Sequence, residues 1–279
     1  MNKLIKHIFG ILLLTCALVS CSEYQKVLKS EDVGLKFKIG DSLYQLGKYE
    51  KANRLFAQIV PKYKGKPQAQ KLMFLYADTF FKMRDYYVSG YQFERFVSSY
   101  PKSERKEEAA FFSAKSYYML CPRYSKDQTE TKEAIEKLQE FINIFPNSQY
   151  LSEANKMIKE LDFKLEKKAF EIAKQYNHIS DYKASIKSFD NFIFQFPGSV
   201  LREDALFYRL DAAYKLAINS LEVKYTPNGK QLLRQSRLKQ AKEYFQAFKT
   251  SYANSKYIEE AQEMASQIDK ELETYTAKS

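Results

Sequence analysis

The sequence predicts an all-α protein, a solenoid of about five divergent helix-turn-helix repeats. Gly and Pro number only 8 and 7 among 279 residues, too few for the turns of a β-sandwich or barrel. Hydrophobic residues make up 45% of the chain, which is enough to build a core and argues against disorder. A short phrase also recurs four times, and a repeated phrase is typical of stacked structural units.

The first 20 residues predict a secretory signal. They contain two lysines and no acid, and then an apolar run from Ile8 to Val19 that is too short to span a bilayer. The run ends in Leu18-Val19-Ser20-Cys21, which resembles the lipobox of bacterial lipoproteins. That resemblance implies a covalent lipid on Cys21 and a lipidated N-terminal tether over residues 21–32. The alternative is an ordinary secretory signal that happens to contain Cys21.

The second helix of each repeat is expected to open with a small residue and to carry large apolar residues one and two turns later. This pattern resembles the tetratricopeptide repeat. The five copies are Ala52 with Phe56, Ser89 with Phe93 and Phe96, Ala134 with Leu138 and Phe141, Ser185 with Phe189 and Phe192, and Ala241 with Phe245 and Phe248.

The recurring phrase follows these second helices. It consists of an aromatic residue, Pro (once Ala), any residue and Ser, with an acid and Ala five and six residues after the Ser. In the first repeat Tyr63-Lys64-Gly65-Lys66 stands in its place. The copies are Tyr100-Pro101-Lys102-Ser103 with Glu108-Ala109, Phe145-Pro146-Asn147-Ser148 with Glu153-Ala154, Phe196-Pro197-Gly198-Ser199 with Asp204-Ala205, and Tyr252-Ala253-Asn254-Ser255 with Glu260-Ala261.

Insertions lengthen the later repeats. In repeat three we expect the extra residues between the two helices, at 121–129, because Pro122 and the polar run after it break the helical pattern. In repeat five Pro227-Asn228-Gly229 predicts a turn. Repeat four is expected to begin with a long helix over residues 151–176, which contains neither Pro nor Gly.

The first helices of repeats one to three carry aromatic residues 37 positions apart, with a second aromatic seven residues further along each helix. Because seven residues make two helical turns, each pair shares one face, and stacked helices would align these faces. In repeats four and five the equivalent residues are less aromatic: Phe170 with Asn177, and Leu210 with Ala217. The alternative for each aromatic residue is packing in the core. The predicted peptide-binding groove consists of Phe37, Asp41, Tyr44, Phe74, Asp78, Phe81, Phe111, Lys115 and Tyr118.

Several functional classes are disfavoured by what the sequence contains. Its formal net charge is +11, but the basic residues are scattered among acids, so we expect solvated helix surfaces and no nucleic-acid partner. His178 is the only histidine outside the signal, which argues against a zinc site or a histidine-activated nucleophile. No Gly-rich phosphate loop is present. We therefore expect no enzyme, no metal and no cofactor other than the lipid on Cys21.

The lipobox, the repeats and the phrase together resemble the BamD family of outer-membrane assembly lipoproteins, over essentially the whole mature chain. The resemblance implies a non-enzymatic adaptor of the barrel-assembly machinery, lipid-anchored on the periplasmic face of the outer membrane. Its implied partners are a BamA-type barrel insertase, other lipoproteins of the machinery, and unfolded outer-membrane proteins bound by their aromatic-rich C-terminal signals. Repeats 1–3 (residues 33–148) would bind the client, and repeats 4–5 (residues 149–279) would dock the insertase.

The alternative function is a tetratricopeptide lipoprotein that serves as a scaffold for secretin or pilus assembly, or that coordinates cell-wall synthesis. Such a scaffold predicts a different membrane partner and no affinity for the signals of barrel proteins. An enzyme such as a wall hydrolase would instead show turnover that a single carboxylate substitution abolishes.

Overall fold

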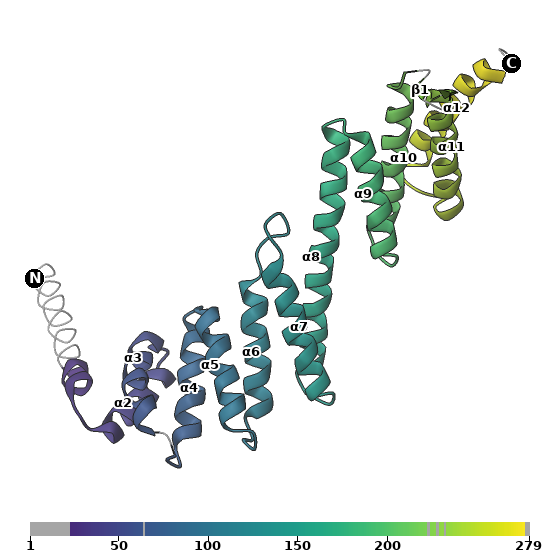
Figure 1. Cartoon of the computed structure of the whole chain (residues 1–279). Coiled ribbons are helices and arrows are strands. Elements are labelled where there is room, and N and C mark those ends of the chain that lie inside the picture. Colours follow the sequence, from purple (N-terminus) through teal and green to yellow (C-terminus); the bar gives the residue numbers. More distant parts are fainter. Residues whose placement is uncertain (1–22, 64, 222–223, 227–228, 232, 277–279) are drawn as a thin grey trace, which may run out of the picture. The chain divides into compact units, whose positions relative to one another are not determined.

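The computed structural model describes residues 23–63, 65–221, 224–226, 229–231 and 233–276 (Figure 1). The expected signal at residues 1–20 and the expected lipidation site Cys21 lie outside these residues. No helix in the described part of the chain is long and apolar enough to cross a bilayer.

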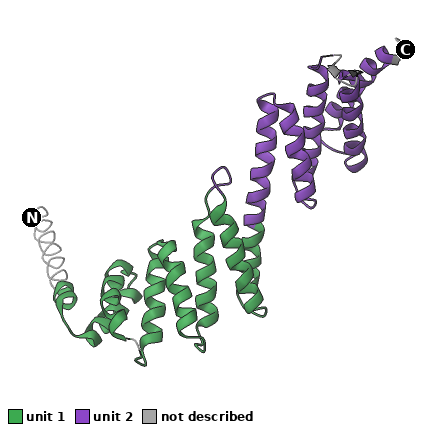
Figure 2. Cartoon of the chain, viewed as in Figure 1, with its two compact units in different colours: residues 1–122, 128–159 green, residues 123–127, 160–279 purple. Residues whose placement is uncertain are grey.

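The chain forms two compact units, which Figure 2 distinguishes by colour. Residues 1–122 and 128–159 make up the first, and residues 123–127 and 160–279 the second. A helical segment over residues 23–29 precedes the helix pairs of the first unit. These pairs are α2 (Val33–Gln45) with α3 (Tyr49–Ile59), α4 (Ala69–Lys82) with α5 (Tyr86–Ser99), and α6 (Lys106–Leu120) with α7 (Thr129–Ile144); the 3₁₀ turn η1 (Val60–Tyr63) follows α3.

The second unit continues the pattern. Helix α8 (Leu151–His178), whose first residues belong to the first unit, is followed by α9 (Tyr182–Gln195), and α10 (Arg202–Ile218) by α11 (Leu233–Ser251). A final helix, α12 (Ile258–Thr276), packs against α10 and α11. The predicted fold class, an all-α tetratricopeptide-repeat solenoid, is thereby confirmed.

The insertions lie where the sequence predicts them. Residues 121–128 connect α6 to α7, and the segment between α10 and α11 contains a small antiparallel hairpin that was not predicted. Its strands are β1 (Lys224–Thr226) and β2 (Gly229–Gln231), and Tyr225 is paired with Lys230. The long helix predicted over residues 151–176 ends two residues later, at His178.

Small residues on the first helices allow large rings of the second helices to pack closely. A Cβ atom added at Gly40 would lie 2.6 Å from the ring of Phe56, so only glycine fits there. The alanines expected at equivalent close contacts, Ala77, Ala114, Ala173 and Ala213, are all buried, as are the rings of Phe56, Phe93, Phe189 and Phe245.

The turns inside repeats one, two and four share one backbone conformation. Gly47, Arg84 and Ser180 adopt the left-handed region, with φ of 72°, 63° and 65°. Each residue directly after them donates its N–H back to a carbonyl of the ending helix at 2.9 Å, which closes the helix in a Schellman motif. In repeats two and four that next residue is Asp85 or Asp181, whose carboxylate also caps the following helix.

The recurring phrase forms the connection from one repeat to the next. We call residues 100–105, 145–150, 196–201 and 252–257 the four linkers. In each, the serine N–H donates to the carbonyl of the aromatic residue, and the serine Oγ accepts the N–H of the residue two positions later. These Oγ contacts are Arg105 N to Ser103 at 3.2 Å, Tyr150 N to Ser148 at 3.0 Å, Leu201 N to Ser199 at 3.1 Å, and Tyr257 N to Ser255 at 3.0 Å.

Three of the linkers are also tied to the first helix of the preceding repeat. Their serine hydroxyls donate to a glutamate four residues before a core phenylalanine of that helix. In two of them the residue two positions after the serine stacks on that phenylalanine: Tyr150 on Phe111 at 4.3 Å and Tyr257 on Phe207 at 4.1 Å between ring centroids. The serine–glutamate bonds are Ser148 to Glu107, Ser199 to Glu166 and Ser255 to Glu203, all 2.6 Å.

The linker at residues 100–105 differs from the other three. Gln70 occupies the place of the glutamate, and no hydrogen bond joins it to Ser103 among the described residues. Arg105 replaces the stacking ring, and its guanidinium carbon lies 3.2 Å from the centroid of Phe74. A cation–π contact and the Arg105–Glu108 ion pair at 2.8 Å therefore close this connection.

The acid and alanine that end the phrase lie in the first turn of the next helix. The four alanines, Ala109, Ala154, Ala205 and Ala261, are fully buried. The acids lie at helix N-termini, where the helix dipole favours negative charge. The aromatic residue, the serine, the acid and the alanine of the phrase therefore each have a structural role.

We predict that Ser148→Ala lowers the free energy of unfolding by about 1–2 kcal/mol, because it removes the acceptor for Tyr150 N–H and the donor to Glu107. Ser103→Ala is the matched control: it removes only the turn contact, since Gln70 takes no part, and should cost about half as much. Urea unfolding of both variants measures the difference. Equal losses would show that the glutamate bond contributes nothing.

Candidate functional site

The nine predicted groove residues lie on α2, α4 and α6, but they do not form one open surface. Phe74 and Phe111 are only 2% and 1% exposed, so the prediction that they line the groove is wrong. Arg105 covers one and Tyr150 the other, and both covering residues come from the linker that follows. The core alternative is therefore correct for these two rings.

The other four aromatic residues, Phe37, Tyr44, Phe81 and Tyr118, are half-buried. Phe37 packs against Tyr63 at 5.6 Å between centroids, and Phe81 lies edge-on to Phe112 at 5.1 Å. One side of each of these rings is thus held by the fold while the remainder meets solvent. Held in this way, a ring presents apolar surface at a low cost in side-chain entropy.

Asp78 is only 4% exposed, and its carboxylate joins the first two repeats instead of facing the groove. The hydroxyl of Tyr44 donates a hydrogen bond to its carboxylate. Burial and this hydrogen bond raise the pKa of Tyr44 above its usual value, so the phenol keeps its proton at neutral pH. In the second unit Asn177 Nδ2 donates to Asp211 Oδ2 at 2.7 Å across the same separation of 34 residues.

The Asn177–Asp211 bond also corrects the register of the fifth repeat. Asp211 corresponds to Asp78, which makes Phe207 and Tyr214 the fifth aromatic pair in place of Leu210 and Ala217. The stacking of Tyr257 on Phe207 agrees with this alignment. Phe207 lies 37 residues after Phe170, the spacing also found in the first three repeats, so the predicted position Leu210 was three residues out of register.

The remaining two predicted polar residues, Asp41 and Lys115, form ion pairs beside the rings. Lys71 Nζ lies 2.6 Å from Asp41 and 5.7 Å from the centroid of Phe37. Lys115 Nζ lies 2.7 Å from Glu153 and 5.5 Å from the centroid of Phe111. Lys71 was missed because the sequence comparison considered only the positions that align with the aromatic residues.

The half-buried rings and these lysines define the candidate groove: Phe37, Tyr44, Phe81 and Tyr118 with Asp41, Lys71, Lys115 and Glu153. Such a surface can bind a peptide through apolar contacts and charge-assisted hydrogen bonds. Within the described residues, no group of three or more His, Cys, Asp or Glu side chains is placed to hold a metal ion.

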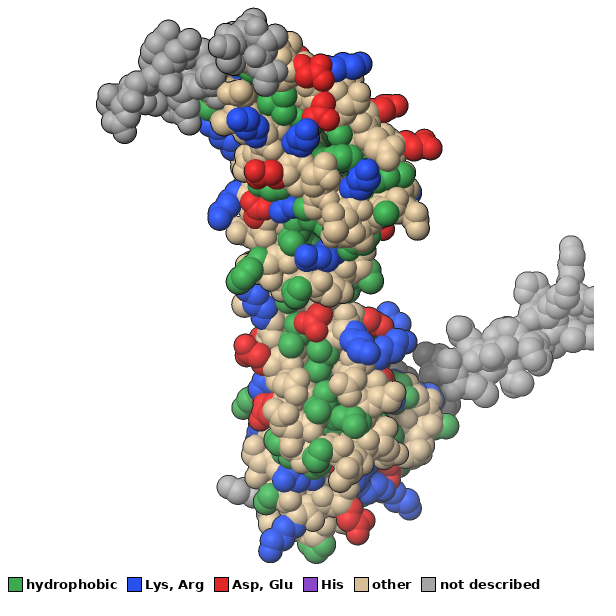
Figure 3. Space-filling view, turned by 90° about the vertical axis from the view of Figure 1, so that its right-hand side faces the viewer, with side chains coloured by type: hydrophobic (Ala, Val, Ile, Leu, Met, Phe, Trp, Pro, Cys, Tyr) green, Lys and Arg blue, Asp and Glu red, His purple; other side chains and the backbone are tan. Residues whose placement is uncertain are grey.

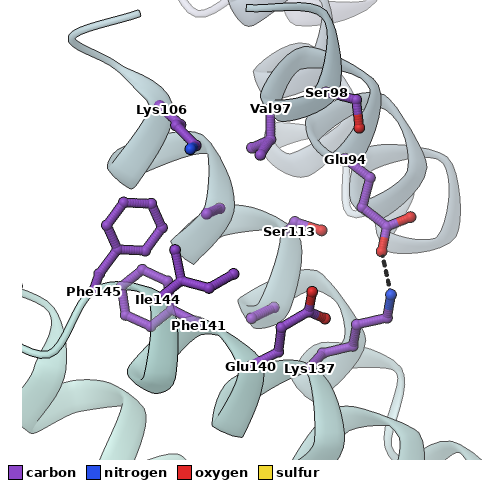
Figure 4. Close-up of a pocket in the computed structure, with 12 residues that line it drawn as sticks. Glu94, Val97, Ser98, Lys106, Ser113, Lys137, Glu140, Phe141, Ile144 and Phe145 are labelled. Atoms are coloured by element: carbon purple, nitrogen blue, oxygen red, sulfur yellow. Dashed lines mark hydrogen bonds and ion pairs between the residues drawn. The ribbon is translucent and has the colours of Figure 1, made fainter. Parts of the chain in front are cut away.

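A second concave feature lies between α5, α6 and α7 in the first unit. It is a cavity of about 300 Å³ lined by residues of all three helices, and Figure 4 shows Val97, Ile144 and Phe145 around it. An ion pair between Lys137 Nζ and Glu94 Oε1, 2.6 Å long, crosses one side. Sequence analysis missed this feature.

Charges of both signs are mixed over the visible surface. Figure 3 shows basic and acidic side chains interspersed on the face that it presents, with apolar side chains between them. Such a mixture of charges is typical of solvated helix surfaces.

Comparison with known proteins places the chain. The model of the YfiO family, described as outer membrane lipoprotein, matches residues 35–226. The outer membrane protein assembly factor BamD of Rickettsia prowazekii (strain Madrid E) is 24% identical over 179 residues, 64% of this chain and 71% of the relative. The protein of that name from Pasteurella multocida (strain Pm70) is 24% identical over 236 residues, 80% of this chain and 89% of the relative.

Among solved structures, the TPR2AB domain of yeast Sti1, in a complex with pHSP90, is similar with a TM-score of 0.38 and 14% identity, and covers 85% of this chain and 98% of that one. That score is too low to bear on the fold, which rests on the helices described above. The family match, in contrast, extends over more than half of the sequence and includes residues of both compact units. The chain therefore belongs to the YfiO family of outer membrane lipoproteins.

Proposed function

We propose that this protein is a non-enzymatic, lipid-anchored adaptor of the barrel-assembly machinery on the periplasmic face of the outer membrane. It binds a BamA-type barrel insertase, contacts other lipoproteins of the machinery, and receives the C-terminal signals of unfolded outer-membrane proteins. The observation that carries this proposal is the family match over residues 35–226, and relatives 24% identical in sequence are named outer membrane protein assembly factors.

The membrane anchor in this proposal is the lipid on Cys21. The sequence Leu18-Val19-Ser20-Cys21 supports it, and two or more acyl chains hold a protein stably on a bilayer. The second residue after the cysteine is Glu23, and no dense acidic run follows, which favours the periplasmic face.

The client site in this proposal is the candidate groove. A C-terminal signal rich in aromatic residues would place its rings against the exposed sides of Phe37 and Phe81, whose other sides are fixed by Tyr63 and Phe112. Each well-placed aromatic pair contributes about 0.5–1.5 kcal/mol beyond the burial of area. Lys71, which lies next to Phe37 and is paired with Asp41, has further N–H groups that can donate to a client carboxylate.

Insertase docking is assigned to repeats 4–5, residues 149–279, on the resemblance to the BamD family. An exposed aromatic side chain supports a contact there: Phe194 on α9 is 87% exposed. Exposed aromatic rings are frequent anchors of protein interfaces.

Affinity isolation tests the proposal directly. We expect a tagged copy, solubilised gently from membranes, to bring down a barrel insertase with periplasmic repeat domains in near-equal amount, as identified by mass spectrometry. An unrelated tagged lipoprotein of the same membrane is the control. Recovery of a secretin or a wall enzyme without the insertase would overturn the assembly role and leave the fold unchanged.

We predict that Cys21→Ala releases the protein from membranes, because the substitution removes the lipidated side chain. Membrane fractionation followed by immunoblotting measures the distribution, and mass spectrometry reports whether the signal was cleaved. Retention of a processed Cys21→Ala protein in the membrane fraction would contradict lipid anchoring at this residue.

We predict that Phe37→Leu with Phe81→Leu weakens client crosslinking about tenfold, because leucine keeps much of the packing volume but loses the aromatic edge contacts. Insertase binding should be unchanged. Phe163→Leu, at a ring 42% exposed outside the groove, is the matched control. Full client crosslinking in the folded double variant would remove the groove from the mechanism. Phe74 is unsuitable for this test because its buried ring supports the core.

A further inference from the structure

A trench runs along the first unit with α6 as its floor and with α5 and α7 as its walls. Helices α5 and α7 each pack on α6 rather than on one another. One end of the trench is the cavity of about 300 Å³ shown in Figure 4, and the other is a cavity of about 650 Å³. We call this feature the α5–α7 trench; the lining residues used below are Tyr87, Tyr91, Glu94, Ser98, Ser113, Tyr117, Glu130, Glu133, Lys137 and Ile144.

The trench exists because α6 has a small residue where α4 has a ring. One period earlier, Tyr76 packs against the core of the first helix pair and lies edge-on to Phe80 at 4.9 Å between centroids. The equivalent of Tyr76 on α6 is Ser113, whose hydroxyl donates to the carbonyl of Gly90 at 3.2 Å. A Cβ atom added at Gly90 would lie 3.2 Å from Tyr117, so α5 and α6 approach closely and leave the space above them unfilled.

Aromatic and aliphatic side chains lie along the rim, and the guanidinium carbon of Arg95 lies 5.8 Å from the ring centroid of Tyr91. Tyr87 and Tyr91 on α5 are 76% and 54% exposed, and Ile144 on α7 is 54% exposed. Exposed rings and aliphatic side chains gathered around a concave surface are typical of an interaction site. The arrangement therefore offers pockets on both sides of a central polar bridge.

That bridge fixes the middle of the trench. Lys137 Nζ lies 2.6 Å from Glu94 Oε1, and the hydroxyl of Tyr117 donates to the same oxygen at 3.2 Å. The hydrogen bond with Glu94 raises the pKa of Lys137 above its usual value, so the ammonium group of Lys137 keeps its proton at neutral pH. Its charges are already matched, so the bridge does not demand a charged ligand.

The two ends differ in charge. The larger cavity is bordered by Glu130 and Glu133, which are exposed and pair with no cation among the described residues. The smaller cavity is bordered by one further cation, Lys106, and one further anion, Glu140, which offset one another. A partner therefore binds more tightly if it places basic residues at the larger cavity and apolar residues at both cavities.

The spacing of the trench matches a helix. Tyr91 lines one cavity and Ser98 the other, and seven residues along α5 correspond to about 10.5 Å. Side chains at i and i+7 of a partner helix have this separation, whereas same-face side chains of an extended strand repeat about every 6.8 Å. We propose that the α5–α7 trench binds an amphipathic helix of a partner protein, with apolar residues at i, i+4 and i+7 and with Lys or Arg facing Glu130 and Glu133.

This site is separate from the candidate groove. On α6 the groove residues are Lys115 and Tyr118, whereas the trench uses Ser113 and Tyr117. At about 100° per residue, these two sets lie on roughly opposite sides of the helix. A helix in the trench and a client segment in the groove would therefore not compete for the same surface.

The test uses the full mature protein in lipid nanodiscs and a fluorescent alanine-based peptide of about 18 residues, long enough to form a helix. The peptide carries leucines at i, i+4 and i+7 and two lysines in its first turn. A second peptide has glutamates in place of the lysines, and a third has a central proline, which prevents the helix. Fluorescence polarisation measures binding of each.

We expect the lysine peptide to bind and the proline peptide to bind at least about tenfold more weakly. Tyr91→Ser with Ile144→Ser should weaken the lysine peptide about tenfold. Leu46→Ser, at a side chain 65% exposed outside the trench, should leave binding unchanged. Glu130→Lys with Glu133→Lys should reverse the preference, so that the glutamate peptide binds more tightly.

Four outcomes would overturn the proposal: no binding of the lysine peptide, equal binding of the proline peptide, no effect of the Tyr91 and Ile144 substitutions, or no change in charge preference after the glutamate reversal. All five substituted side chains, including the control Leu46, are exposed, so the variants should fold, and circular dichroism verifies this. The charge reversal predicts a gain of binding for one peptide, which a damaged protein would not show.

Discussion

The stacking of this protein depends on one serine hydroxyl in each linker. That hydroxyl accepts an N–H inside its own turn, and in three linkers it also donates to a glutamate of the preceding repeat. The two bonds fix the start of the next helix and hold it against the helix before. A local turn thereby sets the geometry between repeats, so the phrase recurs although the helices around it diverge.

The same linkers determine which aromatic residues remain available for binding. The residue two positions after the serine lies on a phenylalanine of the preceding first helix, and it removes that ring from solvent. Of the predicted groove residues, the two rings that the linkers cover, Phe74 and Phe111, hold the core together. Phe37 and the rings two turns further along the helices, Tyr44, Phe81 and Tyr118, keep part of their surface exposed.

Periodicity in the sequence was sufficient to predict the helix pairs, the insertions and the buried small residues, because each depends on local pattern. The burial of Phe111 could not be predicted in this way, since its cover, Tyr150, lies 39 residues away and belongs to another repeat. The trench was missed for a different reason. The trench arises because Ser113 has a small side chain where the equivalent position on α4 has a ring. A pattern of aromatic or charged residues does not reveal such a position.

Because of the loop between α6 and α7, the chain passes back and forth between the two units. Residues 123–127 belong to the second unit, although the helices before and after them belong to the first. Lys168 Nζ donates to the carbonyl of Lys126 at 2.6 Å, and Lys167 lies over the ring of Tyr124 at 4.7 Å, so α8 holds the loop. The chain therefore crosses between the units three times, and no single cut separates it into two intact halves. Truncation, domain exchange and recombination at the midpoint would each leave one unit without a piece of itself.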